Sequence, residues 1–302
     1  MAEASPPAAE RTSQLVMTLL GDYWFATAEH VPSAALAALL AEFGVGAAAT
    51  RAAIRRSTRG GWLEGIRSGR TTAYRLARAE HDRALARARH VMAFGAGPSA
   101  WDGTWTCVAF SIPEADRARR LALRKRLLGL GCGPLFDGLW ITPHPATDEL
   151  DRALRDLGVA GAAVLRVTEV PRTDGVDLRS AWNLAALRAG YQDYLGTLRD
   201  LAPRVDAMGP AQALVARTEV LVGWRNLVTG DPRLPDELLP ADWPLAETRR
   251  RFVATYDALG PVAEARVRQL ITPYAATPPP RHHTVDDVLL RTSDHVRSRQ
   301  MR

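Results

Sequence analysis

The 302-residue sequence has only two cysteines, Cys107 and Cys132, and they form no CxxC pattern. This excludes a disulfide framework and a cysteine-rich metal site, and it is typical of a reducing compartment. No uncharged apolar run approaches the ~18 residues that a membrane span needs, and the N-terminus MAEASPPAAER has no basic-then-apolar signal. These absences predict a cytoplasmic protein that does not enter a membrane.

The short motifs of common enzymes are also missing. The sequence contains no GxSxG, P-loop, GxGxxG or HExxH pattern. One group of metal-ligand residues, His282-His283 with Asp286-Asp287, lies in a segment expected to be a tail. Cys132, between two glycines, is expected in an exposed turn, where a redox role stays open. We therefore predict no catalytic residue, no metal site and no cofactor.

Lysine is scarce, because Lys125 is the only lysine among 39 basic residues. Arginine is common throughout the chain, so its clustering is more informative than its abundance. Residues 47–78 contain eight arginines and one acidic residue, a net charge of +7, whereas the whole chain carries +6. This concentration of charge favours a polyanionic partner.

The elements around the basic stretch follow the order of a winged helix-turn-helix. A helix is expected over 11–20, and Ser33 is a good N-cap for a second helix over 34–42. A tight turn then leads into a third helix over 47–59, with Gly46 in place of a capping Ser or Thr. A strand at Trp62-Leu63, a Ser68-Gly69 turn and a return strand over 71–76 form the predicted wing.

The third helix places Arg51, Arg55 and Arg59 at positions i, i+4 and i+8, on one face. In such folds the helix enters the major groove, where arginine can pair bidentately with guanine, and the wing tip reaches phosphate. Trp62 and Ile54 are expected in the core. The predicted DNA-binding residues are Thr50, Arg51, Arg55, Arg56 and Arg59 on the helix, and Arg67 and Arg70 on the wing.

The rest of the chain predicts a multidomain α+β protein. After a linker at 95–100, strands over 105–110, 135–142 and 162–170 alternate with helices over 114–130 and 147–157, and from residue 178 the pattern is helical. The predicted organisation is a disordered segment at 1–10, a winged helix with its helical connector at 11–94, a ferredoxin-like domain at 95–172, a helical domain at 173–272 and a disordered tail at 273–302.

The aromatic residues of the C-terminal half have two interpretations. Core packing is the plainer one for each tryptophan. They could instead line a pocket for an aromatic ligand, with an arginine against its anionic part. The candidate effector-binding residues on the second interpretation are Trp182, Tyr191, Arg217, Trp224, Arg225 and Trp243.

Three groups of segments, in the right order, resemble the PaaX family of bacterial transcriptional repressors. They are Phe43-Gly44-Val45 with the following wing, the stretch from Trp101-Asp102-Gly103-Thr104-Trp105 to Gly138-Leu139-Trp140, and Asp231-Pro232 with Leu239-Pro240-Ala241-Asp242-Trp243-Pro244. The resemblance covers residues ~11 to ~270. It implies a homodimer that represses an aromatic-degradation operon and is released from DNA by an aryl-CoA thioester such as phenylacetyl-CoA.

The resemblance also implies a central domain like the small CRISPR-associated nuclease used in spacer acquisition. Such nucleases carry an aspartate just after the first strand, where this sequence has Ser111. A metal-dependent nuclease and an effector-independent DNA-binding protein are the alternative functions. Ser111 argues against the nuclease, and the long aromatic-rich helical region argues against a protein that only coats DNA.

Overall fold

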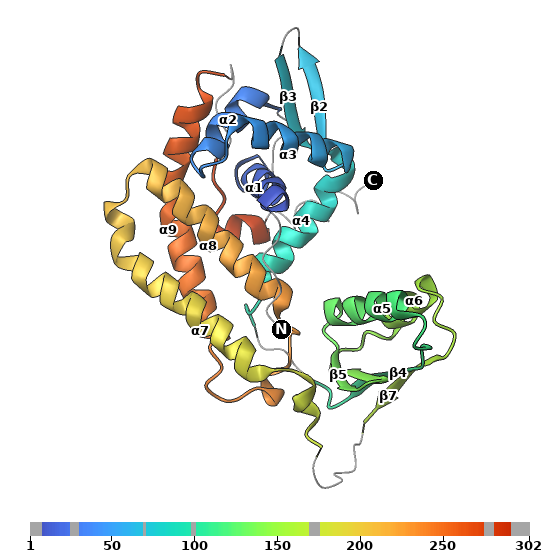
Figure 1. Cartoon of the computed structure of the whole chain (residues 1–302). Helices are drawn as coiled ribbons and strands as arrows, with labels where there is room; N and C mark the ends of the chain where they lie inside the picture. Colours follow the sequence, from blue (N-terminus) through green and yellow to red (C-terminus); the bar gives the residue numbers. More distant parts are fainter. Residues whose placement is uncertain are drawn as a thin grey trace, which may run out of the picture. The chain divides into compact units, whose positions relative to one another are not determined.

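The computed structural model describes residues 8–24, 30–68, 71–97, 101–168, 176–274 and 281–290. Its contacts divide the chain into two compact units, each made from separate parts of the sequence. The first unit combines Met1–Phe94, Leu195–Arg225 and Arg249–Arg302, and the second combines Gly95–Tyr194 and Asn226–Thr248. The protein mixes helices with antiparallel sheets (Figure 1). No described helix is long and apolar enough to cross a membrane.

The first unit begins with three helices and a small sheet. These elements are α1 (Ala8–Tyr23), β1 (Val31–Pro32), α2 (Ser33–Ala41), α3 (Ala47–Arg59), β2 (Leu63–Ser68) and β3 (Thr71–Leu76). The sheet order is β1-β3-β2, and the β2–β3 hairpin extends away from α3 (Figure 1). The predicted helices over 34–42 and 47–59 are confirmed within a residue. The helix predicted over 11–20 is longer at both ends, and the strand predicted at Trp62-Leu63 runs on to residue 68.

The turn between α2 and α3 depends on two glycines. Gly44 has φ +71°, a left-handed conformation that costs glycine little. Gly46 is the N-cap of α3, with an extended backbone and no side-chain cap. The hydroxyl of Thr50, one turn into α3, donates to the Gly46 carbonyl at 3.2 Å. The turn therefore sets the start of α3, and Ala53 and Ile54 lie on its buried face.

Long helices complete the first unit and share a core with the N-terminal elements. They are α4 (Arg78–Ala93), α7 (Leu184–Leu201), which enters from the second unit, α8 (Pro210–Gly230) and α9 (Leu245–Ile271). Trp224 of α8 stacks on Phe252 of α9 with 4.8 Å between ring centroids. Its indole N–H donates to the carbonyl of Val91 in α4 at 2.8 Å. The N-terminal segment is thus packed onto the C-terminal helices.

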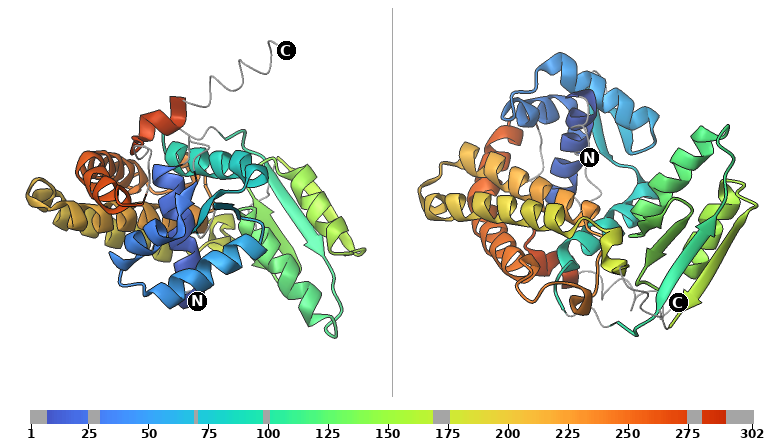
Figure 2. Two further views of the ribbon diagram at one scale, coloured as in Figure 1. Left: turned by 90° about the horizontal axis from the view of Figure 1, so that it is seen from above. Right: turned by 60° about the horizontal axis from the view of Figure 1, so that its bottom comes forward.

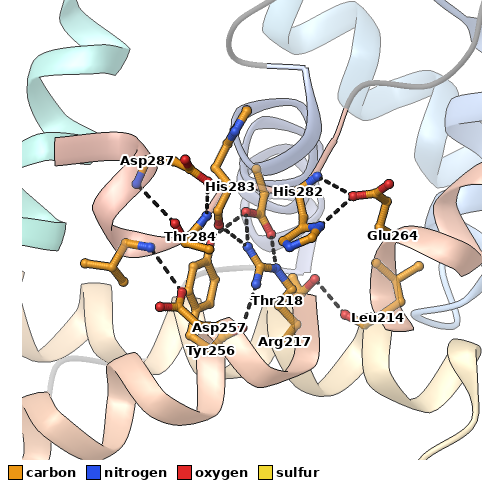
Figure 3. Close-up of polar contacts among 12 residues, drawn as sticks. Leu214, Arg217, Thr218, Tyr256, Asp257, Glu264, His282, His283, Thr284 and Asp287 are labelled. Atoms are coloured by element: carbon orange, nitrogen blue, oxygen red, sulfur yellow. Dashed lines mark hydrogen bonds and ion pairs between the residues drawn. The ribbon is translucent and has the colours of Figure 1, made fainter. Parts of the chain in front are cut away.

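A buried ion pair joins α1 to α8 at the centre of this unit. Arg217 is 0% exposed and donates to both carboxylate oxygens of Asp22, at 3.1 and 3.0 Å. It also donates to the carbonyls of Tyr256, at 2.6 Å, and His283, at 2.7 Å (Figure 3). The Tyr256 hydroxyl donates to Asp22 as well. Burial lowers the pKa of Arg217, but Asp22 and the neighbouring tyrosines outweigh it and leave that pKa raised.

The last described segment, 281–290, is part of this core, so the prediction of a disordered tail is wrong for these residues. Residues 285–290 are helical, and Val285 and Val288 are buried. The Val285 amide donates to Asp257 of α9 at 3.0 Å. His282 contacts the Glu264 carboxylate through its amide, at 2.9 Å, and its Nδ1, at 2.5 Å. The two valines supply the apolar contact that the weak periodicity of this segment concealed.

The second unit contains a four-stranded antiparallel sheet of order β5-β6-β4-β7. Its elements are β4 (Trp105–Phe110), α5 (Arg117–Gly129), β5 (Gly133–Phe136), β6 (Leu139–Thr142), α6 (Thr147–Asp156) and β7 (Ala162–Val167). Leu123 and Leu127 of α5 pack with Val108 and Trp140 of the sheet, so the helices cover one face (Figure 2). The single strand predicted over 135–142 is a hairpin, because Asp137-Gly138 forms a turn.

Removal of the Asp22 carboxylate tests the central ion pair. Asp22→Ala would leave Arg217 buried without its counter-charge, and we expect a loss of about 3–5 kcal/mol in the free energy of unfolding. Urea denaturation followed by circular dichroism measures this value. Arg83→Gln is the control, because Arg83 pairs with Glu80 on the surface of α4 and such pairs contribute at most about 1 kcal/mol. Equal stability of the two variants would contradict the role of the pair.

Candidate nucleic-acid interface

The exposed face of α3 carries three arginines in successive turns. Arg51, Arg55 and Arg59 are all exposed, and none makes a hydrogen bond or ion pair with another described residue. The opposite face, with Ala53 and Ile54, is buried in the first unit. The guanidinium groups of this face are therefore available to an external anion.

Two other residues predicted to bind DNA on α3 have structural partners instead. Thr50 is 1% exposed, and its hydroxyl bonds within the turn before the helix. Arg56 points to α1, where it donates to the Ser13 hydroxyl at 3.2 and 3.3 Å and to the Ala9 carbonyl at 2.5 Å. Both residues hold α3 in place, and the sequence pattern alone did not separate them from the outward-facing arginines.

The wing residues are only partly described. Arg67 lies on the exposed end of β2, whereas Arg70 lies outside the described residues. Glu64 and Arg75 form a cross-strand ion pair of 2.5 Å at the base of the hairpin, and this hydrogen bond lowers the pKa of Glu64. Trp62, expected in the core, is 42% exposed and lies under the guanidinium of Arg87, 5.4 Å from the ring centroid.

The six candidate effector-binding residues are divided between the two units. Arg217, Trp224 and Arg225 lie in the first unit, where the first two are core residues. Arg225 donates to the Thr18 hydroxyl of α1 at 3.0 Å. These three side chains connect α8 to other elements of the first unit. The adjacent Trp224 and Arg225 therefore do not indicate a ligand pocket.

The other three candidates lie in the second unit and are also engaged in packing. Trp182 stacks on Trp105 with 6.1 Å between ring centroids. The Tyr191 hydroxyl donates to Asp231 at 2.5 Å, and its ring meets that of Trp243 edge-on at 6.0 Å. Burial raises the pKa of both Tyr191 and Asp231. The plainer interpretation of these aromatic residues, core packing, fits their positions.

A surface groove of about 740 Å³ lies in the first unit, beside the end of α2. Seven apolar residues, two glutamates, one glutamine and one arginine line it. Its lining residues are Glu42, Leu201, Pro203, Arg204, Ala207, Met208, Ala211, Gln212, Val215, Ala216 and Glu219. Glu42, which follows α2, also accepts two hydrogen bonds from Arg266 of α9, at 2.7 and 3.0 Å. Sequence reasoning missed this groove, because its lining residues form no motif.

The residues considered for chemistry are not assembled into a reactive site in the described part of the chain. Ser111 follows β4 and is exposed, and its amide donates to the Gly161 carbonyl. No group of three or more His, Cys, Asp or Glu residues that could hold a metal ion occurs among the described residues. Cys132, expected to be exposed, is 1% exposed, and burial raises the pKa of its thiol to about 12. It is therefore protonated at neutral pH and shielded from oxidants.

Comparison with known proteins identifies the family. Models of the PaaX family match three successive parts of the chain: the PaaX-like protein model residues 11–80, the PaaX protein central Cas2-like domain residues 98–177, and the PaaX-like protein C-terminal domain residues 182–269. The chain belongs to the PaaX family. The transcriptional repressor PaaX of Escherichia coli strain K12 is 27% identical to it over 266 residues, which cover 85% of this chain and 83% of that repressor.

A solved structure is similar to this chain over most of its length. An uncharacterized protein from Mycobacterium tuberculosis matches this PaaX-family chain with a TM-score of 0.55 and 27% sequence identity. The match covers 86% of this chain and 97% of the other. The similarity therefore extends over both compact units and is not limited to the basic helix and its hairpin.

Proposed function

We propose that this PaaX-family protein is a ligand-responsive transcriptional repressor that acts in the cytoplasm as a homodimer on double-stranded operator DNA. The observation that carries the proposal is the outward face of α3, where Arg51, Arg55 and Arg59 have no partner among the described residues. The similarity of the chain to a named transcriptional repressor supports the same function. A dimer would present two such helices to two half-sites of an operator.

In this proposal α1–α3 with the β2–β3 hairpin are a winged helix-turn-helix. Helix α3 lies in the major groove, where Arg51 and Arg55 reach base edges and can pair with guanine O6 and N7. Arg67, at the exposed end of β2, contacts phosphate beside the groove. Arg56 acts only indirectly, because its contacts with α1 keep α3 in position.

The effector is an aryl-CoA thioester such as phenylacetyl-CoA, and we assign it to the groove beside α2. The volume of the groove is within the ~300–1,000 Å³ range of small-molecule sites. Leu201, Met208 and Val215 offer apolar contact, and Arg204 offers a partner for a phosphate. A ligand that binds more tightly when Glu42 leaves Arg266 would shift α2 and weaken DNA binding. Bound DNA would then lower the affinity for the ligand by the same factor.

The nuclease alternative receives no support from a specific contact. Ser111 offers a hydroxyl where a metal-binding carboxylate would be needed, and no acidic side chain forms a hydrogen bond with it. The repressor function accounts for the arginine face of α3, whereas the nuclease would leave it unexplained.

Substitution of the α3 arginines tests the proposed recognition. Arg51→Ala and Arg55→Ala should each weaken binding to the upstream region of the protein's own gene by about 1–3 kcal/mol if the side chain reads a base. Fluorescence anisotropy with a labelled duplex measures this affinity. Arg250→Ala is the control, because it removes the same charge from an exposed position on α9. Wild-type affinity in the Arg51→Ala/Arg55→Ala double variant would exclude the helix as the recognition element.

Arg67 tests the wing. Its replacement by alanine should weaken specific and non-specific duplexes alike and reduce the slope of log K against log salt by about 1, because one phosphate contact is lost. The slope is obtained from anisotropy titrations over a salt series. A slope equal to that of the wild-type protein would place this end of the hairpin away from DNA.

Arg204 tests the effector groove. Loss of a charge-assisted hydrogen bond is worth about 1.5–3 kcal/mol, so Arg204→Gln should weaken phenylacetyl-CoA binding by roughly ten- to a hundredfold. Isothermal titration calorimetry gives the affinity, and Arg250→Gln removes an equal charge from an exposed position on α9. If both variants bind phenylacetyl-CoA as tightly as the wild type, the groove is not its site.

A further inference from the structure

Helix α5 in the second unit is a second concentrated source of positive charge. Between residues 117 and 126 it has five arginines, the single lysine of the chain and no acidic residue. Leu123 and Leu127 fix its orientation, because both are 0% exposed and pack under the helix against the sheet. The basic side chains are therefore distributed over the sides and the outer face.

Half of these cations have partners within the second unit. Arg119 forms an ion pair of 3.0 Å with Asp116, Arg120 donates to the Ile112 carbonyl at 2.8 Å, and Arg124 lies 3.6 Å from Asp137. Arg117, Lys125 and Arg126 are exposed and make no hydrogen bond or ion pair with another described residue. These three form the outward charge of the helix.

The outer face of α5 around these three cations carries no acidic residue. Ala118, Ala122 and Gly129 add little bulk beside Lys125, and the exposed Leu121 lies between Arg117 and Lys125, one turn from each. Arg117 and Lys125 are eight residues apart, or about 12 Å along the helix axis. That distance is close to the ~12 Å width of the major groove, so the two cations can reach phosphates on both of its edges.

We propose that the outer face of α5 is a second DNA contact, which holds the phosphate backbone irrespective of sequence. This inference rests on the proposed function, because it assumes that duplex DNA is the partner of the protein. The exposed cations complement a polyanion, and contacts with its phosphates carry no sequence information. The α3 face selects the site, and α5 adds affinity that depends on salt.

Leu121 and Leu128, which are 71% and 60% exposed on the same helix, distinguish DNA from other kinds of partner. An anionic membrane or an acidic protein would bury these leucines, whereas contact with the DNA backbone depends on the cations. Replacing the leucines should therefore weaken binding to a membrane or an acidic protein, whereas replacing the cations should weaken binding to DNA.

The test uses the full-length protein and a long duplex of unrelated sequence, with anisotropy measured over a salt series. The variant Arg117→Gln/Lys125→Gln/Arg126→Gln should lose up to about 2–3 in the slope of log K against log salt and bind at least about tenfold more weakly at low salt. A matched variant, Arg152→Gln/Arg250→Gln/Arg281→Gln, removes the same charge from other exposed positions. It should keep the wild-type slope, as should Leu121→Gln/Leu128→Gln.

Arg117→Lys/Arg126→Lys retains the charges and should also keep the wild-type slope, which shows that a lower slope reflects lost charge and not a damaged fold. Equal slopes for the α5 glutamine variant and its matched control would overturn the inference. A second result would also overturn it: the wild-type protein binds phosphatidylglycerol vesicles, the leucine variant does not, and the α5 glutamine variant binds the duplex as tightly as the wild type. Failure of the wild-type protein to bind any duplex would instead refute the proposed function.

Discussion

The first unit depends on one buried ion pair, because Arg217 cannot lie in the core without a counter-charge. Asp22 supplies that charge from α1, and the carbonyls of Tyr256 and His283 accept the remaining hydrogen bonds (Figure 3). The pair thereby joins the first helix of the chain, the long C-terminal helices and the segment at 281–290. The position of the basic face of α3 is set within this assembly.

Two other contacts of the first unit provide a route by which the proposed effector would act on DNA binding. The end of α2 is tied to α9 by the Glu42–Arg266 pair, and α3 is tied to α1 by Arg56. A ligand beside Glu42 would therefore act on the recognition helix through short, direct contacts within one unit. No transmission over a long distance is required, and the coupling need only reach the ~1–3 kcal/mol that is usual for such switches.

Several stretches that carry the family resemblance are structural supports of the second unit. Asp231 accepts from the Tyr191 hydroxyl, and the Pro232 carbonyl contacts His144 Nε2 at 2.9 Å. Gly131 approaches the same carbonyl so closely that an added Cβ would lie 2.8 Å from the Pro232 oxygen. A side chain at residue 131 would push these segments apart.

The sequence allowed prediction of features that depend on near neighbours. The helix over 47–59, its glycine cap and its arginine face follow from helical spacing and local turn chemistry. Contacts between distant residues could not be predicted: Asp22 and Arg217 are 195 residues apart, and a buried arginine looks the same in sequence as a ligand-binding one. The hairpin in the stretch predicted as one strand over 135–142 did have a local signal, the Asp-Gly pair at 137–138.

The most direct test of the account is a methylation interference experiment on the operator, in which guanine N7 is methylated before the protein binds. We expect that methylation of specific guanines blocks the wild-type protein and that Arg55→Ala becomes insensitive to one of them. Arg250→Ala, which removes an equal charge from an exposed position on α9, should keep the full pattern. An interference pattern that is identical for the wild-type protein, Arg51→Ala and Arg55→Ala would contradict recognition by the exposed face of α3.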